Sequence, residues 1–334
     1  MPKWTYPTPT TYPSQRPTRP NCSDSSLKVS IAPLPSNIHK MKKALIPFIL
    51  ILVVLTANAQ STHRNYEADS IAFVNAMWQT DSMDGFIYRH YHFQQQQVFN
   101  SNQYICVIEI PRGSTSRLAF VSDTLLTRVS EFANRSNALA GINGSFFNMS
   151  TGVPVCYLKI KGHKLGDNEP NKRDSTQRKY YQNAAIRLLP SGRPRFNIPD
   201  SNRLSEYQMP DSNVMTTGPM LIYRGEVVPQ RTDLRFVYGR HNRTAIGLKQ
   251  DGTIVLVVVD GRHRRQSEGL SIPELTRVMK WLGCREAANL DGGGSSCMYV
   301  KGMGEDGVVN HPSDNGRFDS HGQRRVANAI MVVK

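Results

Sequence analysis

Two Asp-Gly strings that follow apolar runs place carboxylates where they could act as acids, bases or stabilisers of positive charge. Residues 254–259 are wholly apolar and precede Asp260, and residues 287–290 precede Asp291. Such runs predict buried strands, whose ends present side chains into clefts. We therefore predict Asp260 and Asp291 as catalytic residues. Because Asp-Gly is also a common turn dipeptide, the catalytic and turn interpretations of Asp260 are evenly balanced.

The glycine-rich string after Asp291 predicts an anion site. Gly292, Gly293 and Gly294 would let the backbone approach a ligand closely and direct N–H groups at a phosphate, and Ser295 adds a hydroxyl donor. No Gly-Lys-Ser/Thr follows, so the string is not a Walker A loop. The alternative is an ordinary tight turn.

Other residues near predicted strands could complete such a site. Arg243 and Arg324 each come before a strand and are predicted to bind phosphate, with a solvated surface position as the alternative for either. Asn143, Gly144 and Thr244 are predicted to contact a sugar. Asn143-Gly144 could equally be a plain turn beside a core made by Phe146 and Phe147.

One histidine is a weak acid–base candidate, and no metal site is indicated. His311 lies in a polar loop near Arg324. The His90-x-His92 pair has no evident third ligand, and the cysteine spacing fits no zinc pattern. We predict that no cofactor is required, although a divalent cation near Asp291 would be compatible with the sequence. A serine hydrolase is disfavoured because no G-x-S-x-G string is present.

The elements that must position these residues are mainly hairpins. Apolar strands separated by Gly-containing turns predict an α+β fold: a single domain on a large mixed, mostly antiparallel sheet with a few packed helices. Helices are predicted at 70–79, with Ile71, Val74 and Trp78 on one side, and at 124–134, with Leu125, Val129 and Phe132 inward. The clearest helix is 272–282, with a Ser271/Glu274 capping box. Residues 94–97 are predicted as a loop.

Composition bounds the class of protein. The chain has 334 residues, 39% of them hydrophobic, and a formal net charge of +15. That is enough apolar material for a full core and too much for a disordered chain. The basic residues are scattered, without a basic helix or a nucleic-acid module, so we predict no nucleic-acid partner.

The N-terminus has the pattern of an exported protein. Residues 1–40 are rich in proline and predict either a disordered extension or a start assigned too early. Residues 41–59 show a basic start, a short apolar run and an A-x-A site, which predict a signal peptide. Residues 60–84 are a helical lead-in, and 85–334 the main domain. We expect export to the periplasm or medium, with no stable membrane span after cleavage.

Four cysteines follow the predicted cleavage site: Cys106, Cys156, Cys284 and Cys297. Export permits disulfides, and the sequence leaves all three pairings open.

Taken in order, seven short motifs resemble the phosphodiester glycosidase family. They begin at Asn143, Gly218, Arg243, Val259, Gly269, Asn289 and Arg324, and the string Asn-Leu-Asp-Gly-Gly-Gly-Ser-Ser at 289–296 is the most specific of them. The resemblance covers about residues 85–334. Ser145 and Cys297 depart from residues usual in the family, Gly and Thr, which bears on substrate detail.

The resemblance implies an exported enzyme that hydrolyses a sugar-1-phosphodiester, such as a GlcNAc-1-phosphodiester, at the anomeric C–O bond. Its substrate would be a glycan or glycolipid phosphodiester. Two rivals remain: a non-catalytic protein that binds phosphoglycans on the same fold, and a metal-dependent phosphodiesterase that cleaves P–O. Which aspartate does what, and whether configuration is retained, depend on a carboxylate separation that the sequence does not give.

Overall fold

A computed structural model describes residues 66–230 and 235–334. The described residues belong to one compact unit. The predicted N-terminal extension and signal peptide lie outside the described residues. The α+β class and the antiparallel character are confirmed, since every strand pairing within the described ranges is antiparallel and helices are few. The strands divide among three sheets rather than forming a single large one.

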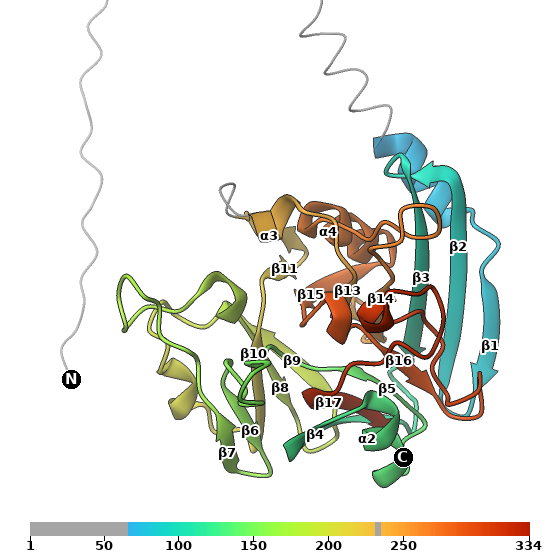
Figure 1. Ribbon diagram of the computed structural model, residues 1–334. Helices are drawn as coiled ribbons and strands as arrows, with labels where there is room; N and C mark the ends of the chain where they lie inside the picture. The colour runs from blue at the N-terminus through green and yellow to red at the C-terminus, as the bar shows by residue number, and fades with distance from the viewer. Residues whose placement is uncertain (1–65, 231–234) are drawn as a thin grey trace, which may run out of the picture. The chain divides into compact units, whose positions relative to one another are not determined.

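The largest sheet has eight strands and runs through the middle of the unit (Figure 1). In spatial order its strands are β1 (Gln79–Met83), β2 (Phe86–Val98), β3 (Ser101–Ile110), β14 (Ile254–Val259), β13 (Arg243–Lys249), β15 (Cys284–Asn289), β11 (Met220–Tyr223) and β12 (Glu226–Val227).

Two smaller sheets complete the strand framework. The five-stranded sheet consists of β7 (His163–Gly166), β6 (Leu158–Ile160), β10 (Asn213–Thr217), β8 (Ala184–Leu188) and β9 (Pro194–Asn197). The four-stranded sheet consists of β16 (Met298–Val300), β5 (Ala140–Asn143), β17 (Val326–Val333) and β4 (Arg117–Thr127). In Figure 1 the five-stranded sheet lies on the side of the unit away from β1–β3.

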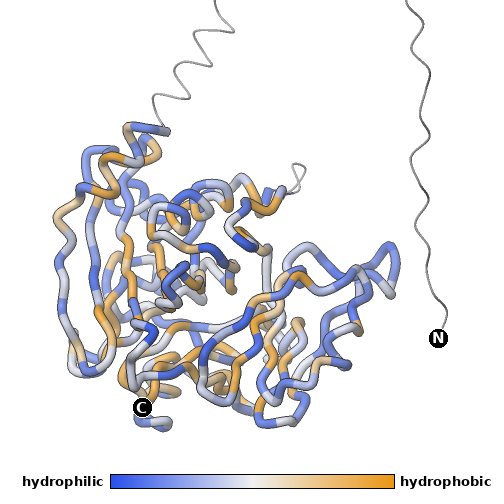
Figure 2. Tube along the Cα trace, turned by 180° about the vertical axis from the view of Figure 1, so that it is seen from behind, coloured by the Kyte–Doolittle hydropathy of each residue, from blue (hydrophilic) through white to orange (hydrophobic). Residues whose placement is uncertain are grey.

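The central strand β14 explains how the layers share their core. All six of its residues are buried, as its unbroken apolar run predicts. Ile254, Leu256 and Val258 face the core shared with the smaller sheets, whereas the alternate residues face the core beneath α4. The strand is therefore covered on both faces, and Figure 2 shows apolar segments gathered along the inner strands with hydrophilic loops outside.

Helix α4 (Ile272–Trp281) covers one face of the large sheet. Ser271 is its N-cap, and the predicted capping box is confirmed because Ser271 and Glu274 bond to each other's backbone N–H groups. Gly283 follows at φ +83°, the left-handed conformation that ends many helices. The remaining helices are α2 (Val129–Arg135), α3 (Arg235–Tyr238), the unlabelled helix at 66–74, and the 3₁₀ turns η1 (Tyr180–Gln182), η2 (Ser205–Gln208), η3 (Gly293–Ser295) and η4 (Ser313–Asn315).

Three predicted elements need correction. The first helix spans 66–74 rather than 70–79, and it buries Phe73, while Ile71 and Val74 are more than half exposed. Residues 124–127 belong to β4, which pairs with β17, so the helix begins only at Val129. Residues 94–97 lie within β2, although the pairing of β2 with β3 is irregular between Phe93 and Val98.

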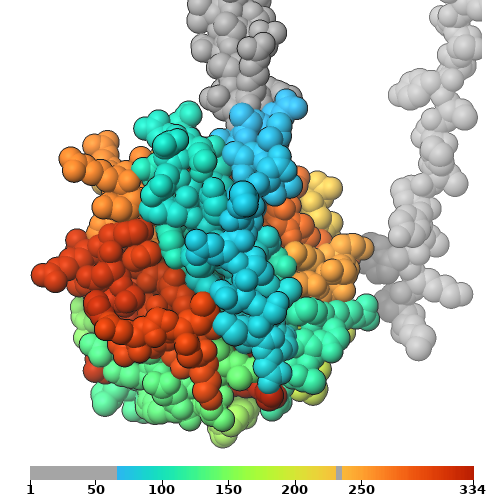
Figure 3. All heavy atoms as spheres, turned by 90° about the vertical axis from the view of Figure 1, so that its right-hand side faces the viewer, coloured from blue at the N-terminus to red at the C-terminus, as the bar shows by residue number. Residues whose placement is uncertain are grey.

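The β1–β2 hairpin reaches the segment that follows β16. In Figure 3 its blue and cyan atoms run beside the orange-red C-terminal loops. Tyr88 donates from its hydroxyl to the carbonyl of Val309, and the His92 and Phe318 rings lie 6.0 Å apart. Among the described residues, no helix has the length and apolar character needed to cross a bilayer.

Candidate functional site

Three neighbouring strands bring Asp260, Asp291 and Arg243 to one edge of the large sheet. Strands β14 and β15 both run antiparallel to β13, so both end where β13 begins. Arg243 pairs with Val259, directly before Asp260, and Ala245 pairs with Asn289, two residues before Asp291. The predicted strand-end carboxylates therefore do share one edge.

Asp260 is completely enclosed. Its side chain is 0% exposed. Oδ1 accepts a hydrogen bond from Asn310 Nδ2 at 2.8 Å, and Oδ2 accepts from both the backbone N–H and the ring Nδ1 of His311, each at 2.8 Å. A carboxylate bonded in this way has no open approach to a substrate. The structure gives it a positioning role, which is to hold the 310–311 segment and orient the imidazole.

His311 is consequently a better-defined acid–base candidate than the sequence indicates. Because its Nδ1 donates to Asp260, its Nε2 is the nitrogen left to accept a proton. The Phe318 ring stacks on the imidazole at 3.8 Å and 12°, and the Tyr104 ring meets it edge-on at 4.6 Å. The side chain remains 24% exposed. Sequence reasoning missed Phe318 and Tyr104, because ring contacts between β3 and a distant loop leave no local signal.

Asp291 has the opposite environment. Its backbone is fixed by Asn143 Nδ2, which donates to its carbonyl at 2.8 Å, and by Gly144, whose carbonyl accepts from its N–H at 3.1 Å. Among the described residues, the one hydrogen bond of ordinary length to its carboxylate comes from the adjacent Gly292 N–H, at 2.9 Å. Burial raises the pKa of Asp291 to about 6, while the nearby Ser295 hydroxyl, the Gly292 N–H and the charge of Arg324 oppose that rise. A carboxyl of this pKa changes protonation near neutral pH.

Most N–H groups of the glycine string are used within the protein, and among the described residues only that of Gly294 has no partner, so they do not form the predicted nest. The N–H of Gly292 is used by Asp291, that of Gly293 donates to the Asn242 carbonyl at 2.9 Å, and that of Ser295 donates to the Gly292 carbonyl at 3.2 Å. Ser295 itself is 1% exposed, and its Oγ has no partner at ordinary hydrogen-bond length among the described residues.

The glycines instead allow two arginine side chains to approach. A Cβ on Gly293, at φ +61°, would lie 2.7 Å from Arg262 Nη2. A Cβ on Gly294 would lie 2.4 Å from Arg324 Nη2 and 2.6 Å from Asp314 Oδ1. A side chain at either glycine would therefore force these guanidinium groups to move.

Arg324 is anchored on one side and weakly engaged on the other. Asp314 accepts from its Nε at 3.0 Å and also from its Nη2, whereas its Nη1 donates to the thioether of Met149 at 3.4 Å. Sulfur is a weak acceptor, so a phosphate oxygen would replace it readily. Arg262, which sequence reasoning left unassigned although it belongs to the Val-Asp-Gly-Arg motif, is exposed and bonds through its guanidinium to no described residue.

Arg243 does not present its guanidinium to a ligand. It is 1% exposed and donates to the carbonyls of Leu270, Phe236 and Gly239 at 2.8–2.9 Å. Burial lowers its pKa to about 10. Its charge still contributes to the site, because the pKa of His241 is lowered by burial and then by Arg243 and Arg262. The prediction of Arg243 as a direct phosphate ligand is replaced by a structural and electrostatic role.

The predicted sugar-binding residues lie beneath the site. Asn143 and Thr244 are at most 1% exposed, and Thr244 Oγ1 donates to Asn143 Oδ1 at 2.8 Å. Gly144 is buried, and a Cβ there would lie 2.1 Å from Asn328 Oδ1. These residues position Asp291 rather than face a sugar. Buried side chains and turn glycines share residue types with binding sites, so the sequence did not separate the two.

No described residues form a group of three or more His, Cys, Asp or Glu side chains suited to a metal ion. The four cysteines of the described ranges are buried and unpaired, so none of the three disulfide arrangements left open by the sequence is present.

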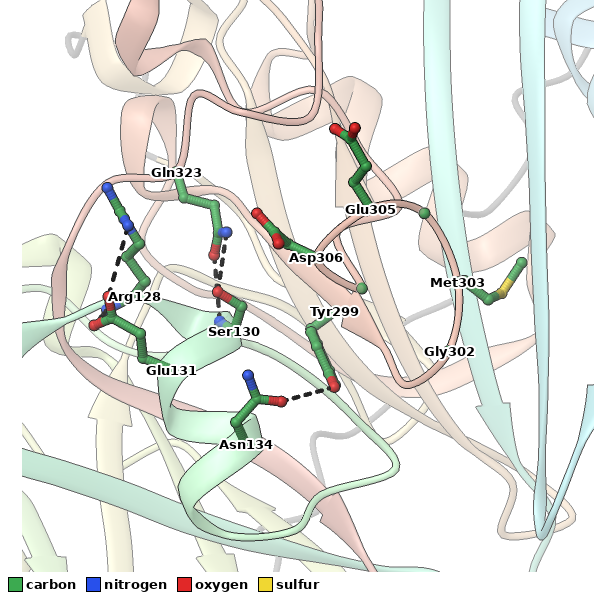
Figure 4. A pocket seen from close by; sticks show the side chains of 12 residues that line it. Arg128, Ser130, Glu131, Asn134, Tyr299, Gly302, Met303, Glu305, Asp306 and Gln323 are labelled. Atoms are coloured by element: carbon green, nitrogen blue, oxygen red, sulfur yellow. Dashed lines mark hydrogen bonds and ion pairs between the residues drawn. The ribbon is translucent and has the colours of Figure 1, made fainter.

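A separate hollow of about 480 Å³ lies beside α2 (Figure 4). Gln323 and Ser130 bond to each other on one side of it, and Tyr299 donates to Asn134 Oδ1 at 3.1 Å on the other. Its charged lining residues are three carboxylates and one arginine, namely Glu131, Glu305, Asp306 and Arg128. That balance disfavours a phosphodiester in this hollow.

Comparison with known proteins identifies relatives of this architecture. The chain matches the sequence profile of the phosphodiester glycosidase family over residues 136–333, more than half its length. The uncharacterized SPbeta prophage-derived protein YomE of Bacillus subtilis is 44% identical over 75 residues, which are 22% of this chain and 11% of YomE. Bovine N-acetylglucosamine-1-phosphodiester alpha-N-acetylglucosaminidase is 24% identical over 218 residues, covering 61% of this chain and 38% of the bovine protein. The chain thus matches less than half the length of either relative.

Solved structures share the fold. The catalytic domain of zebrafish N-acetylglucosamine-1-phosphodiester alpha-N-acetylglucosaminidase, auto-inhibited by its pro-peptide, superposes with a TM-score of 0.57 at 16% identity, covering 81% of this chain and 92% of that one. A hypothetical protein from Synechocystis gives 0.53 at 16% identity, with 77% and 64% covered.

Proposed function

Because the chain belongs to the phosphodiester glycosidase family, we propose that it hydrolyses a sugar-1-phosphodiester at the anomeric C–O bond. The products are the free sugar and a phosphomonoester. One observation carries the proposal: a titratable carboxyl and two arginines meet around the turn at Gly292–Gly294, while Asp260, which orients the His311 imidazole, follows a strand that ends at the same edge of the sheet.

The phosphodiester binds at the two arginines. Arg324 receives a phosphate oxygen on the side now facing the Met149 thioether, and Arg262 supplies a second cation at the neighbouring glycine. The buried charge of Arg243 adds to the positive potential at this edge. These fixed cations stabilise the negative charge that grows on the phosphate as the C–O bond breaks.

The leaving group determines how much acid catalysis is needed. A phosphomonoester has a second pKa near 6, so it departs more readily than a sugar alkoxide and requires little protonation. In the proposed step, water adds to the anomeric carbon and transfers its proton to His311 Nε2. The electron pair of the C–O bond passes to the phosphate oxygen.

While the C–O bond breaks, Asp291 stabilises the positive charge that develops on the sugar. As a carboxylate it stabilises an oxocarbenium-like centre, and its raised pKa reports a partly dehydrated position where such an interaction is strong. Asp260 contributes by holding the Nδ1–H tautomer of His311.

The bond that breaks distinguishes this proposal from its rivals. Hydrolysis of a GlcNAc-1-phosphodiester in ¹⁸O-labelled water should place the label in the sugar and none in the phosphate. Label in the phosphate, with chelator sensitivity, would instead establish a P–O-cleaving phosphodiesterase. Binding without turnover, unchanged in Asp291→Asn, would establish a phosphoglycan-binding protein.

Export is a further part of the proposal. The basic, apolar and A-x-A pattern of residues 41–59 supports it. Expression of the whole chain in a bacterial host should yield a mature N-terminus at about residue 60 in the periplasm or medium. Retention of residues 1–59 in the cytosol would contradict it.

A further inference from the structure

A rigid hairpin extends from the site into a region that the proposed reaction does not use. Phe147 and Pro154 pair across it, the Asn148 N–H donates to the Val153 carbonyl at 2.8 Å, and the Gly152 N–H donates to the Asn148 carbonyl at 2.8 Å. At the tip, Asn148 Oδ1 accepts from the N–H groups of Ser150 and Thr151 at 2.9 and 3.2 Å. The hairpin, residues 147–154, follows directly after the Asn143-Gly144 segment that fixes Asp291.

One side of this hairpin contacts the arginine site. Met149 lies at the tip, is 61% exposed and accepts a hydrogen bond from Arg324 Nη1. A diester phosphate bound at that nitrogen therefore displaces or touches the Met149 side chain. Methionine is flexible and polarizable, which suits contact with an apolar group.

The other side of the hairpin lines a hollow of about 420 Å³. Val153 and Leu165 face this hollow while being 55% and 46% exposed, and Pro154 lies between them in its wall. A Cβ on Gly152 would lie 3.4 Å from the Leu126 side chain. Single exposed apolar residues are common on protein surfaces, but Val153 and Leu165 are both exposed at one hollow, close in sequence to the exposed Met149, and core packing does not explain them.

We propose that this hollow, called here the hairpin hollow, receives an apolar aglycone of the phosphodiester. The inference rests on the proposed function and deepens it by naming the chemical class on the far side of the phosphate. With one phosphate oxygen on Arg324 Nη1, the ester substituent passes Met149 and lies along Val153, Pro154 and Leu165. The substrate class is accordingly a sugar phosphodiester of an alkyl or lipid alcohol.

Charge and polarity favour this occupant over a sugar or peptide aglycone. Among the described residues, Asp123 is the one charged residue that lines the hollow, and it is paired with Arg135 at 2.7 Å. The other polar lining residues are Ser122, Thr124 and Thr151. A hydrocarbon chain needs no hydrogen bonds in such a place and gains from the loss of water.

The test compares two substrates that share GlcNAc-1-phosphate, one esterified to methanol and one to decanol, the latter below its micelle-forming concentration. The wild-type kcat/KM should be about tenfold or more higher for the decyl diester. The variants Val153→Thr and Leu165→Asn should reduce the decyl-to-methyl ratio at least threefold. Val227→Thr, at a 47%-exposed site on β12, is the matched control and should leave the ratio unchanged.

The outcomes separate the two proposals. If both diesters are hydrolysed equally well and no variant changes the decyl-to-methyl ratio of kcat/KM, the proposal that the hairpin hollow binds the aglycone is overturned. The proposed reaction is then unaffected. If neither diester is hydrolysed, the proposed function fails. Calorimetry with decyl and methyl phosphate then tests the hollow alone, and equal affinities overturn it.

Discussion

Asp260 and Asp291 occupy corresponding places, each directly or almost directly after a buried strand and before a glycine, yet their environments differ. Asp260 is enclosed by three hydrogen bonds from Asn310 and His311, whereas Asp291 accepts one from its own neighbour and has a pKa raised to about 6. The comparison teaches that a fully enclosed carboxylate with several hydrogen bonds supports another group, whereas a half-buried carboxylate with few hydrogen bonds has a raised pKa and oxygen atoms still available to a ligand.

The largest expected effect is on catalysis at Asp291. Asp291→Asn keeps the shape of the side chain and removes its charge, so kcat should fall by about 10³-fold or more, with KM changed little. Steady-state kinetics on a GlcNAc-1-phosphodiester measure this. A decrease in kcat of less than tenfold would show that the carboxylate does not stabilise charge at the anomeric carbon.

Asp260→Asn should have the next largest effect, about 10²-fold on kcat/KM, because the amide no longer holds the His311 tautomer. The readout that separates positioning from simple destabilisation is the pH profile, whose histidine limb should shift or vanish. Asp319→Asn, in an exposed bond to Asn315, is the control and should retain the wild-type profile. An unshifted profile in Asp260→Asn would reduce the residue to a structural role.

Gly294→Ala should lower kcat/KM by roughly 10–100-fold, since its Cβ would displace Arg324 and Asp314 and weaken a charge-assisted contact to phosphate. Gly113→Ala is a matched control, because a Cβ there meets nothing within 4 Å. If the two variants were equally active, the close approach of Arg324 to Gly294 would not be needed for activity.

The smallest effect is on stability and depends on pH. The folded pKa of Asp291 is raised from 3.8 to about 6, so its neutral form favours folding below pH 4, and stability is lost as pH rises through 6. At pH 7 the ionised Asp291 lowers the free energy of unfolding by about 1–3 kcal/mol. Asp291→Asn should therefore be more stable than wild type at pH 7 and similar at pH 4. Denaturant unfolding at pH 4 and pH 7 measures the free energy of unfolding of both proteins. The same difference between variant and wild type at the two pH values would contradict this prediction.

Elements with strong local signals were predictable. The capping box fixed the start of α4, and the apolar run of β14 indicated burial on both faces. The prediction of a helix at 124–127 was wrong. Leu125 continues the helical spacing of Val129 and Phe132, but the segment belongs to a strand that pairs with β17, about 200 residues further along the chain. Local periodicity carries no information about such a partner.

The site was predictable in its location and not in its assignments. The prediction that both aspartates follow buried strands correctly placed Asp260 and Asp291 at one edge of the sheet. The environment of each, however, depends on Asn310, His311 and Arg324, which lie near the C-terminal end of the sequence. Arg243 and Thr244 have the residue types of ligands and are buried because β13 is a central strand. Arg262, in the separate Val-Asp-Gly-Arg motif that begins at Val259, is the exposed arginine beside the glycine string.

The placement of β17 has a consequence for the timing of biosynthesis. Arg324 stands two residues before β17, which pairs with β4 and β5, strands made nearly 200 residues earlier. During synthesis, Arg324 can therefore reach its place beside Gly294 only after this late strand has left the ribosome and paired. The proposed anion site would be complete only at that stage.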